Sequence, residues 1–171
     1  NFVVGGDAEG GSIFATYKDA AGSSPVDGTG GIPTVANITT TSSSPLVGAN
    51  SFLLTHPASN VQGDGWSYDF TIDAAYQAKV LQLSFDYVVN SGTFVAGTAT
   101  TDSDVTVWIY DKTNNVLIQP SSYKLLSQSA TVSDKFNATF QTAANSTSYR
   151  LIFHNASAST SAFTLRIDSV T

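Results

Sequence analysis

Two large aromatic residues, Trp108 and Tyr110, have the side-chain type and spacing that best suit ligand binding. They alternate with Val105, Val107 and Ile109. Such alternation predicts a β-strand, and if the aliphatic residues face the core, the two aromatic rings face outward. Outward rings can stack on the apolar C–H faces of sugars, so the pattern indicates a platform for carbohydrate.

Three polar residues are expected beside this platform. The same parity argument places Asp86, Arg150 and His154 on outward faces of their strands. Carboxylate, guanidinium and imidazole groups bind sugar hydroxyls, so strands sharing one sheet would form a sugar-binding cleft. Two other interpretations stay open. A loop or a neighbouring subunit could cover this face, or the aromatic rings could belong to a second core.

Catalytic chemistry has little support in the sequence. The chain has two histidines, His56 and His154, and neither lies near a nucleophile motif. A glycosidase needs two carboxylates across a cleft, one of them with a raised pKa. Asp102 and Asp104 are neighbours, but they lie in a polar turn where we expect both to stay solvated. We therefore expect a protein that is not an enzyme.

The elements that must position these residues are strands. The longest clean alternation, residues 79–90, places Leu81, Leu83, Phe85 and Tyr87 on one face, which a second sheet must cover. Other stretches expected as strands are 12–18, 51–57, 65–73, 104–111, 135–142, 148–155 and 161–170. No amphipathic helix separates them. The sequence therefore predicts an all-β fold, a two-sheet antiparallel β-sandwich of the jelly-roll type.

Composition limits the size and the partners of the domain. Its 171 residues suit a single β-sandwich domain over 1–171. Methionine is absent even at position 1, so we expect a domain excised from a longer chain or a processed product. A net charge of −6 excludes nucleic acid and an anionic membrane surface as expected partners. No apolar run approaches the roughly 20 residues of a membrane-spanning helix.

Three short patterns carry a family resemblance: NFVVGGDAEGG at 1–11, VGANSFLLTH at 47–56 and TLRIDSVT at 164–171. In this order they resemble β-sandwich carbohydrate-binding modules of families 4, 9 and 22, and similar domains occur in phage tail and virion proteins. The resemblance implies a non-catalytic module of an extracellular or phage adhesion protein, with a glycan or polysaccharide as partner. One departure is that Ala8 stands where the family usually has Phe, and no Trp follows Glu9.

The same resemblance implies a structural calcium ion. In the family, the matching glutamate and the aspartate of the closing strand hold calcium, which here implies Glu9 and Asp168. Backbone carbonyls near Asn50 and the Gly10 region would complete the set, with Asp7 as an additional ligand. Calcium takes about 6–8 oxygen ligands, which two carboxylates, carbonyls and water can supply. Alternatively, these carboxylates are unrelated surface or turn residues.

A second functional class stays open beside the sugar-binding one. A structural domain of a phage virion or tail, contacting other virion subunits without binding sugar, would use the same aromatic residues. Either class places the protein outside the cell or on a virion. An exposed Trp108 beside Arg150 and Asp86 favours the first class, and an aromatic face buried against another chain favours the second.

Overall fold

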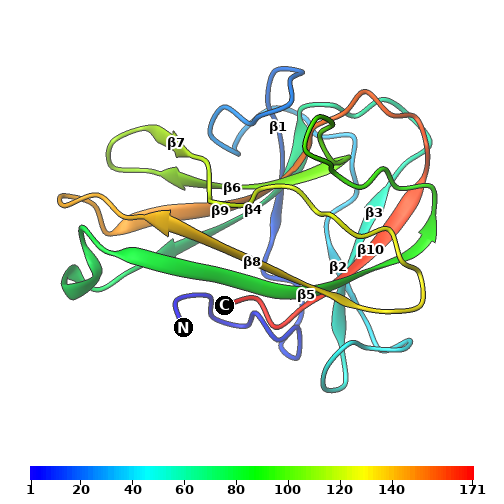
Figure 1. The fold of residues 1–171 in the computed structure, drawn as a ribbon, viewed down its shortest axis with the longest axis horizontal. Helices are drawn as coiled ribbons and strands as arrows, with labels where there is room; N and C mark the ends of the chain where they lie inside the picture. The colour runs from blue at the N-terminus through cyan, green and yellow to red at the C-terminus, as the bar shows by residue number, and fades with distance from the viewer.

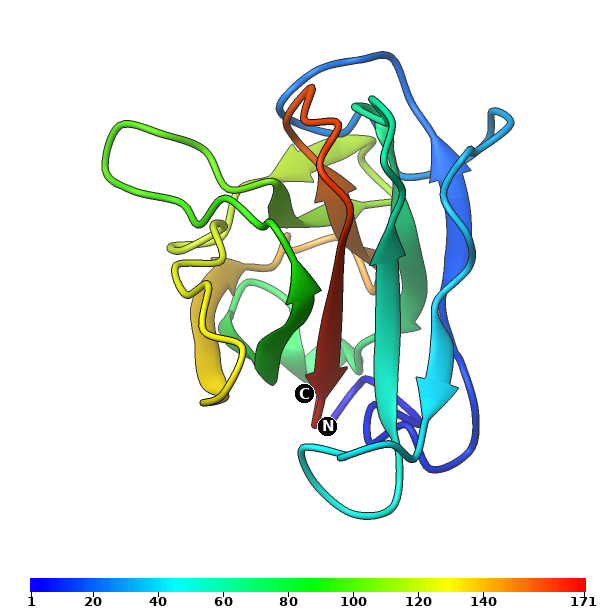
Figure 2. The ribbon, with the colours of Figure 1, turned by 90° about the vertical axis from the view of Figure 1, so that its right-hand side faces the viewer.

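The computed structural model describes all 171 residues, which form two antiparallel five-stranded sheets packed face to face (Figures 1 and 2). Sheet A has the order β1 (Ala15–Lys18), β4 (Asp64–Thr71), β9 (Ser148–Asn155), β6 (Val105–Asp111) and β7 (Val116–Ile118). Sheet B has the order β2 (Thr39–Thr41), β3 (Ser51–His56), β10 (Phe163–Asp168), β5 (Val80–Gly92) and β8 (Asp134–Gln141). The predicted all-β sandwich is confirmed.

The core lies between the sheets and follows the predicted parity. Leu83, Phe85 and Tyr87 of β5 are all buried, and Val105 and Val107 of β6 are fully buried in the same cluster. Because β5 and β6 belong to different sheets, these residues face each other across the sandwich. The prediction for the inward faces of both strands is therefore confirmed.

The 3-10 helix η1 (Ala74–Tyr76) is the only helix of the structure, and it is far too short to cross a membrane. The two ends of the chain lie side by side at one end of the sandwich (Figures 1 and 2). There the Val170 N–H donates to the Gly6 carbonyl at 2.8 Å, and Ser84 and Thr171 exchange two backbone hydrogen bonds of 2.9 Å. The opening turn is thus tied to the residues that follow β10.

One connecting segment lies over the outer face of sheet A, and another pairs with the edge of the sheet at β6. Loop 19–31 follows β1, and its Gly28 fits closely because a Cβ there would lie 2.7 Å from Ile152 Cδ1. Its φ of +71° also favours glycine. Segment 119–127 runs beside β6, where the Val107 N–H donates to the Tyr123 carbonyl at 2.7 Å. These two segments determine which outward side chains reach the surface.

Candidate functional site

The outer face of sheet A has two differently exposed regions. The covered half consists of the outward residues beneath loop 19–31 and segment 119–127: Tyr17, Thr106, Trp108, Ile152 and His154. The open half is the row of residues at the uncovered end of the same strands: Asp69, Tyr110, Lys112 and Arg150. Of the residues predicted for a sugar site, Trp108 and His154 fall in the covered half, and Tyr110 and Arg150 in the open half.

Trp108 is not the exposed platform that the sequence predicts. Only 7% of the residue is exposed, and its ring lies 5.1 Å from the ring of Tyr123. Its indole N–H donates to the Thr106 hydroxyl at 2.9 Å. Parity correctly places Trp108 outside the sandwich core, but segment 119–127 pairs with β6 and covers it. For the covered half, the alternative interpretation that a loop covers this face is therefore correct.

His154 is also buried, which contradicts its predicted place at the edge of a ligand site. Its Nε2 lies 3.0 Å from the Gly22 carbonyl and its Nδ1 lies 2.8 Å from the Tyr17 hydroxyl. Because a carbonyl only accepts, Nε2 donates to Gly22, and Nδ1 accepts from Tyr17. Burial lowers the pKa of His154 and raises the pKa of Tyr17 well above its usual value. The hydrogen bond from His154 to Gly22 anchors loop 19–31 to the sheet.

Asp86 does not join the other predicted site residues either. It lies on β5 in sheet B, whereas Tyr110 and Arg150 lie on sheet A. Its carboxylate pairs with Lys135 Nζ of the adjacent strand β8 at 3.2 Å. Alternation indicates which way a side chain points relative to its own sheet, but it does not indicate which sheet a strand joins.

The open half contains a charged row that crosses three strands. Asp69, Arg150 and Tyr110 are register neighbours on β4, β9 and β6. Arg150 makes a bidentate pair with Asp69, with Nε–Oδ1 of 2.6 Å and Nη2–Oδ2 of 3.1 Å, and Lys112 Nζ lies 2.5 Å from Oδ2. Burial acts to raise the pKa of Asp69, but hydrogen bonds from Arg150 and Lys112 hold it below the usual value. Asp69 is thus an ionised acceptor whose side chain is 47% exposed.

Two hollows adjoin this row. One, of about 350 Å³, is lined by Thr16, Thr29 and Ser67 beside Asp69 and Arg150. The other, of about 210 Å³, is lined among others by Lys112, Ser148, Tyr68 and again Asp69. Because Asp69 and Tyr68 line both hollows, the exposed carboxylate stands between them.

Sequence reasoning missed Asp69 and Lys112 as site residues. Asp69 alternates with the core aromatic residues Trp66, Tyr68 and Phe70, so its outward direction could have been inferred in the same way as that of Arg150. Lys112 follows the end of β6, where alternation gives no signal. Its position beside Asp69 comes from the pairing of β6 and β4 with the two sides of β9.

Asp102 and Asp104 both bind residues of loops. Asp104 is 2% exposed, so the expectation that it stays solvated is wrong. It accepts the Val95 N–H at 2.8 Å and the Ser157 hydroxyl at 2.5 Å. Asp102 accepts the Tyr123 hydroxyl at 3.1 Å and pairs with Lys124 at the same distance. Both carboxylates hold segments that connect strands.

Glu9, Asn50 and Asp168, which the family resemblance places together, do meet around the turn 47–51. Glu9 Oε1 accepts the N–H groups of Ala49 and Asn50 at 2.7 and 3.0 Å. Asp168 Oδ2 accepts the Val47 N–H at 3.1 Å and the Ser51 hydroxyl at 2.8 Å. The two backbone hydrogen bonds lower the pKa of Glu9, so this carboxylate is ionised at neutral pH.

This arrangement fits a cation in donor type. Glu9 Oε2 receives only the Asn50 side-chain amide, at 3.3 Å, and Asp168 Oδ1 receives hydrogen bonds only from Ser169. Both carboxylates therefore keep acceptor capacity. Asp7 accepts the Glu9 N–H at 3.4 Å within its own turn. No group of three or more His, Cys, Asp or Glu side chains is placed to hold a metal, so a cation here would also need carbonyl oxygens or water.

No protein-family model and no curated protein matches the sequence. Solved structures match the fold. A family 16 carbohydrate-binding module has a TM-score of 0.57 and 15% identity, and the match covers 100% of this chain and 98% of that one. A family 11 module of a Clostridium thermocellum cellulase has a TM-score of 0.53 and 13% identity, over 96% of this chain and 89% of that one. The fold is that of carbohydrate-binding modules.

A phage protein shares this fold as well. The enzymatically active domain of tailspike protein 4 from bacteriophage CBA120 has a TM-score of 0.60 and 13% identity over 99% of this chain. This chain spans only 21% of the tailspike chain. The resemblance to carbohydrate-binding modules and to a phage tail domain, inferred from three short patterns, is thus confirmed at the level of the fold.

Proposed function

We propose that this domain is a non-catalytic carbohydrate-binding module of an extracellular or virion protein, and that it binds glycan on the open half of sheet A. The observation that carries the proposal is the row of Asp69, Arg150 and Tyr110 beside two hollows. In this row the Asp69 side chain is 47% exposed, Tyr110 is half-buried, and the Arg150 side chain is only 11% exposed. The half-buried Tyr110 ring offers a face for a sugar ring, and its hydroxyl donates to Asn115 at 3.2 Å, which orients it.

Arg150, Asp69 and Lys112 have different roles in the proposed binding of sugar. Arg150 uses three of its five N–H groups within the protein, since Nε and Nη2 bind Asp69 and Nη1 donates to the Asp27 carbonyl at 2.9 Å. It therefore orients the Asp69 carboxylate, which accepts hydrogen bonds from sugar hydroxyls. Lys112 keeps N–H groups for sugar oxygens. A held carboxylate loses little side-chain entropy on binding, which favours affinity.

The known structures support a glycan as the ligand class. Several proteins that share the fold are carbohydrate-binding modules, and a Clostridium thermocellum xylanase with family 22 and catalytic modules was solved with xylohexaose. Shallow hollows of this kind bury little ligand surface, so we expect a Kd between about 1 μM and 1 mM.

A glycan array followed by calorimetry on the best ligand tests the proposal. Asp69→Asn should weaken binding at least about tenfold, or about 1.4 kcal/mol. Asp86→Asn is the matched control, because Asp86 carries the same charge and also pairs with a lysine, but lies on sheet B. A folded wild-type domain that retains no glycan at millimolar concentration contradicts the proposal. If Asp69→Asn and Asp86→Asn lost the same amount of glycan affinity, the binding site would not be the open half of sheet A.

The tailspike similarity favours one alternative, a structural domain of a phage tail that contacts other virion subunits. In that case a neighbouring subunit would cover the open half of sheet A. Assembly of the whole parent protein distinguishes the two functions. Tyr110→Arg should disrupt assembly if the row is a subunit contact, and it should leave assembly unchanged if the row binds glycan.

We also propose that Glu9 and Asp168 hold one structural calcium ion, with carbonyls near Asn50 and Gly10 and with Asp7 as a further candidate ligand. Calcium would neutralise two neighbouring carboxylates and tie the opening turn to the end of β10. A site filled 100-fold above its Kd stabilises a protein by about 2.7 kcal/mol, which is about 5–11 °C in Tm for this length. A melt that is unchanged by chelator, with no metal found by elemental analysis, contradicts this.

A further inference from the structure

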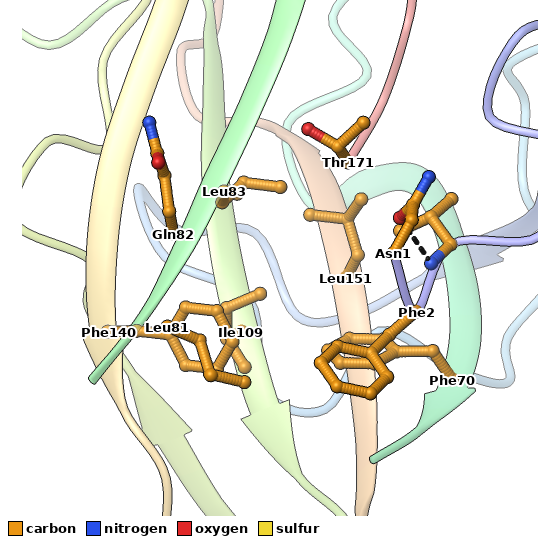
Figure 3. Close-up of a pocket in the computed structure, with 11 residues that line it drawn as sticks. Asn1, Phe2, Phe70, Leu81, Gln82, Leu83, Ile109, Phe140, Leu151 and Thr171 are labelled. Carbon is orange, nitrogen blue, oxygen red and sulfur yellow. Dashed lines mark hydrogen bonds between the residues drawn. The ribbon is translucent and has the colours of Figure 1, made fainter. Parts of the chain in front are cut away.

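A cavity of about 320 Å³ lies between the two sheets, at the end of the sandwich where the chain termini meet (Figures 1 and 3). Eight of its eleven lining residues are hydrophobic, and none of the lining side chains carries a charge. Its strand walls lie mostly on the inner faces of the sheets, and it shares Phe2 and Phe70 with the hollow of about 210 Å³ beside Asp69. The proposed glycan-binding groups Asp69, Tyr110 and Lys112 do not line it.

Both sheets contribute walls to the cavity. Leu83 of β5 and Phe140 of β8 come from sheet B, whereas Phe70 of β4 and Leu151 of β9 come from sheet A. Figure 3 shows these side chains pointing toward one another, with Asn1 and Thr171 beside the cavity. All four apolar walls are buried residues on regular strands. The walls that come from strands are therefore preformed, whereas Asn1, Phe2, Val3 and Thr171 belong to the chain ends.

The cavity is a pocket that opens to solvent, since the exposed residues Asn1, Gln82 and Thr171 line it together with buried apolar residues. An apolar surface inside a pocket does not stabilise water, and an engineered cavity of about 150 Å³ binds benzene. Ligand pockets begin at about 300 Å³, which places this cavity in their range. Its volume suits a guest larger than benzene.

The mouth of the cavity has an apolar side at Phe2 and a polar side at Asn1, Gln82 and Thr171. Phe2 is partly buried and packs edge-on against Tyr76, with 5.0 Å between ring centroids. Tyr76 is 43% exposed, and Val80, next to the lining residue Leu81, is 63% exposed. The backbone around Phe2 is fixed mainly by side chains, since the Val4 N–H donates to the Tyr68 hydroxyl at 3.1 Å.

We propose that this cavity is a binding site for a small uncharged apolar molecule, of one or two aromatic rings or an equivalent alkyl chain. The aromatic walls Phe2, Phe70 and Phe140 supply ring contacts, and Leu83, Ile109 and Leu151 fill the remaining surface. A polar substituent of the guest would lie at the Asn1, Gln82 and Thr171 side.

Titration with indole, followed by methyl NMR, tests this site directly. The methyl groups of Leu83, Ile109 and Leu151 should shift in a saturable way, whereas those of Ile38, which does not line the cavity, should not. This titration uses the wild-type domain alone. Absence of saturable shifts up to millimolar indole, or shifts centred on other methyl groups, overturns the proposal.

A pair of adjacent tryptophan substitutions supplies the matched control. Leu81→Trp places the indole of the new side chain in the cavity and should weaken indole binding at least tenfold. Val80→Trp adds the same side chain on the neighbouring exposed position and should leave binding within twofold. Equal binding by the two folded variants contradicts the proposal. If Leu81→Trp fails to fold, the wild-type methyl map alone decides the outcome.

Discussion

The covered and open halves of sheet A use the same strands and the same outward parity, yet they have opposite environments. Trp108 and Tyr110 are two residues apart on β6, and His154 and Arg150 are four apart on β9. Loop 19–31 and segment 119–127 bury the first of each pair, whereas Tyr110 is half-buried and Arg150 is covered in part by Asp27 of loop 19–31. The direction of a side chain thus comes from its strand, whereas its exposure comes from the loops.

The largest expected difference between the halves is in stability, which substitutions in the covered half should lower more than substitutions in the open half. Removing a buried aromatic side chain costs about 3–5 kcal/mol, so Trp108→Ala should destabilise the domain by this amount. Tyr110→Ala, on the partly exposed neighbour, should cost about 1 kcal/mol or less. Urea unfolding of both variants measures the difference. Equal losses would show that segment 119–127 does not cover Trp108 in solution.

Substitutions in the open half should weaken glycan binding more than substitutions in the covered half. Tyr110→Ala should weaken the best array ligand about tenfold or more, or about 1.4 kcal/mol, because it removes the proposed stacking face. Trp108→Phe keeps an aromatic ring under Tyr123 and should leave affinity within twofold. Calorimetry measures both. A loss confined to the Trp108 variant would restore the site that the sequence predicts.

Acid should weaken the covered half through His154. Burial holds its pKa below the ordinary value of 6.5, so the folded state favours the neutral ring. Its contribution to stability is complete above about pH 6.5 and is lost as the pH falls below that value. His154→Gln should therefore show a smaller drop in urea midpoint between pH 7 and pH 5 than the wild type. Some pH dependence should remain, because burial also lowers the pKa of His56. An unchanged pH profile contradicts the buried position of His154.

The ion pairs of the open half should have the smallest effect on stability. Lys112→Ala removes a solvent-exposed pair with Asp69, and such pairs contribute about 0.2–1 kcal/mol. Because the pKa of Asp69 is lowered, this contribution is present above the ordinary value of 3.8 and is lost as the pH falls through the folded-state pKa. Urea midpoints at low and high salt measure it. A loss above about 2 kcal/mol would indicate a buried network.

The sequence predicts the sandwich well because inward parity is a local property. The alternation of Leu83, Phe85 and Tyr87 holds in the structure, and Phe85 stacks on Phe136 of the adjacent strand at 4.6 Å. The resemblance of the two ends also predicts that Glu9 and Asp168 share a calcium ion, and in the structure both carboxylates accept hydrogen bonds from the turn 47–51. These expectations depend on residues close in sequence or on a pattern shared by a family.

The site is harder to predict because it depends on contacts between distant segments. Asp86 and Arg150 have the same outward direction but lie on different sheets, and strand pairing decides this. The burial of His154 comes from Gly22, which is 132 residues away in the chain. The alternation of residues along a strand carries no information about strand pairing or about burial by a distant loop. Asp69 has the right parity, but only its pairing with Arg150 distinguishes it from other outward aspartates.

The tie between the opening turn and the end of the chain has a mechanical consequence. Gly6 approaches Val170 so closely that a Cβ there would lie 2.1 Å from the Val170 carbonyl oxygen, so this contact needs glycine. Since both ends emerge on the same side of the sandwich, tension between them would load this short contact first and peel it open. The long hydrogen-bonded ladders of β5 and β9 would carry no shear at that stage. A domain that holds a fixed surface ligand could therefore yield at its termini while its binding face keeps its shape.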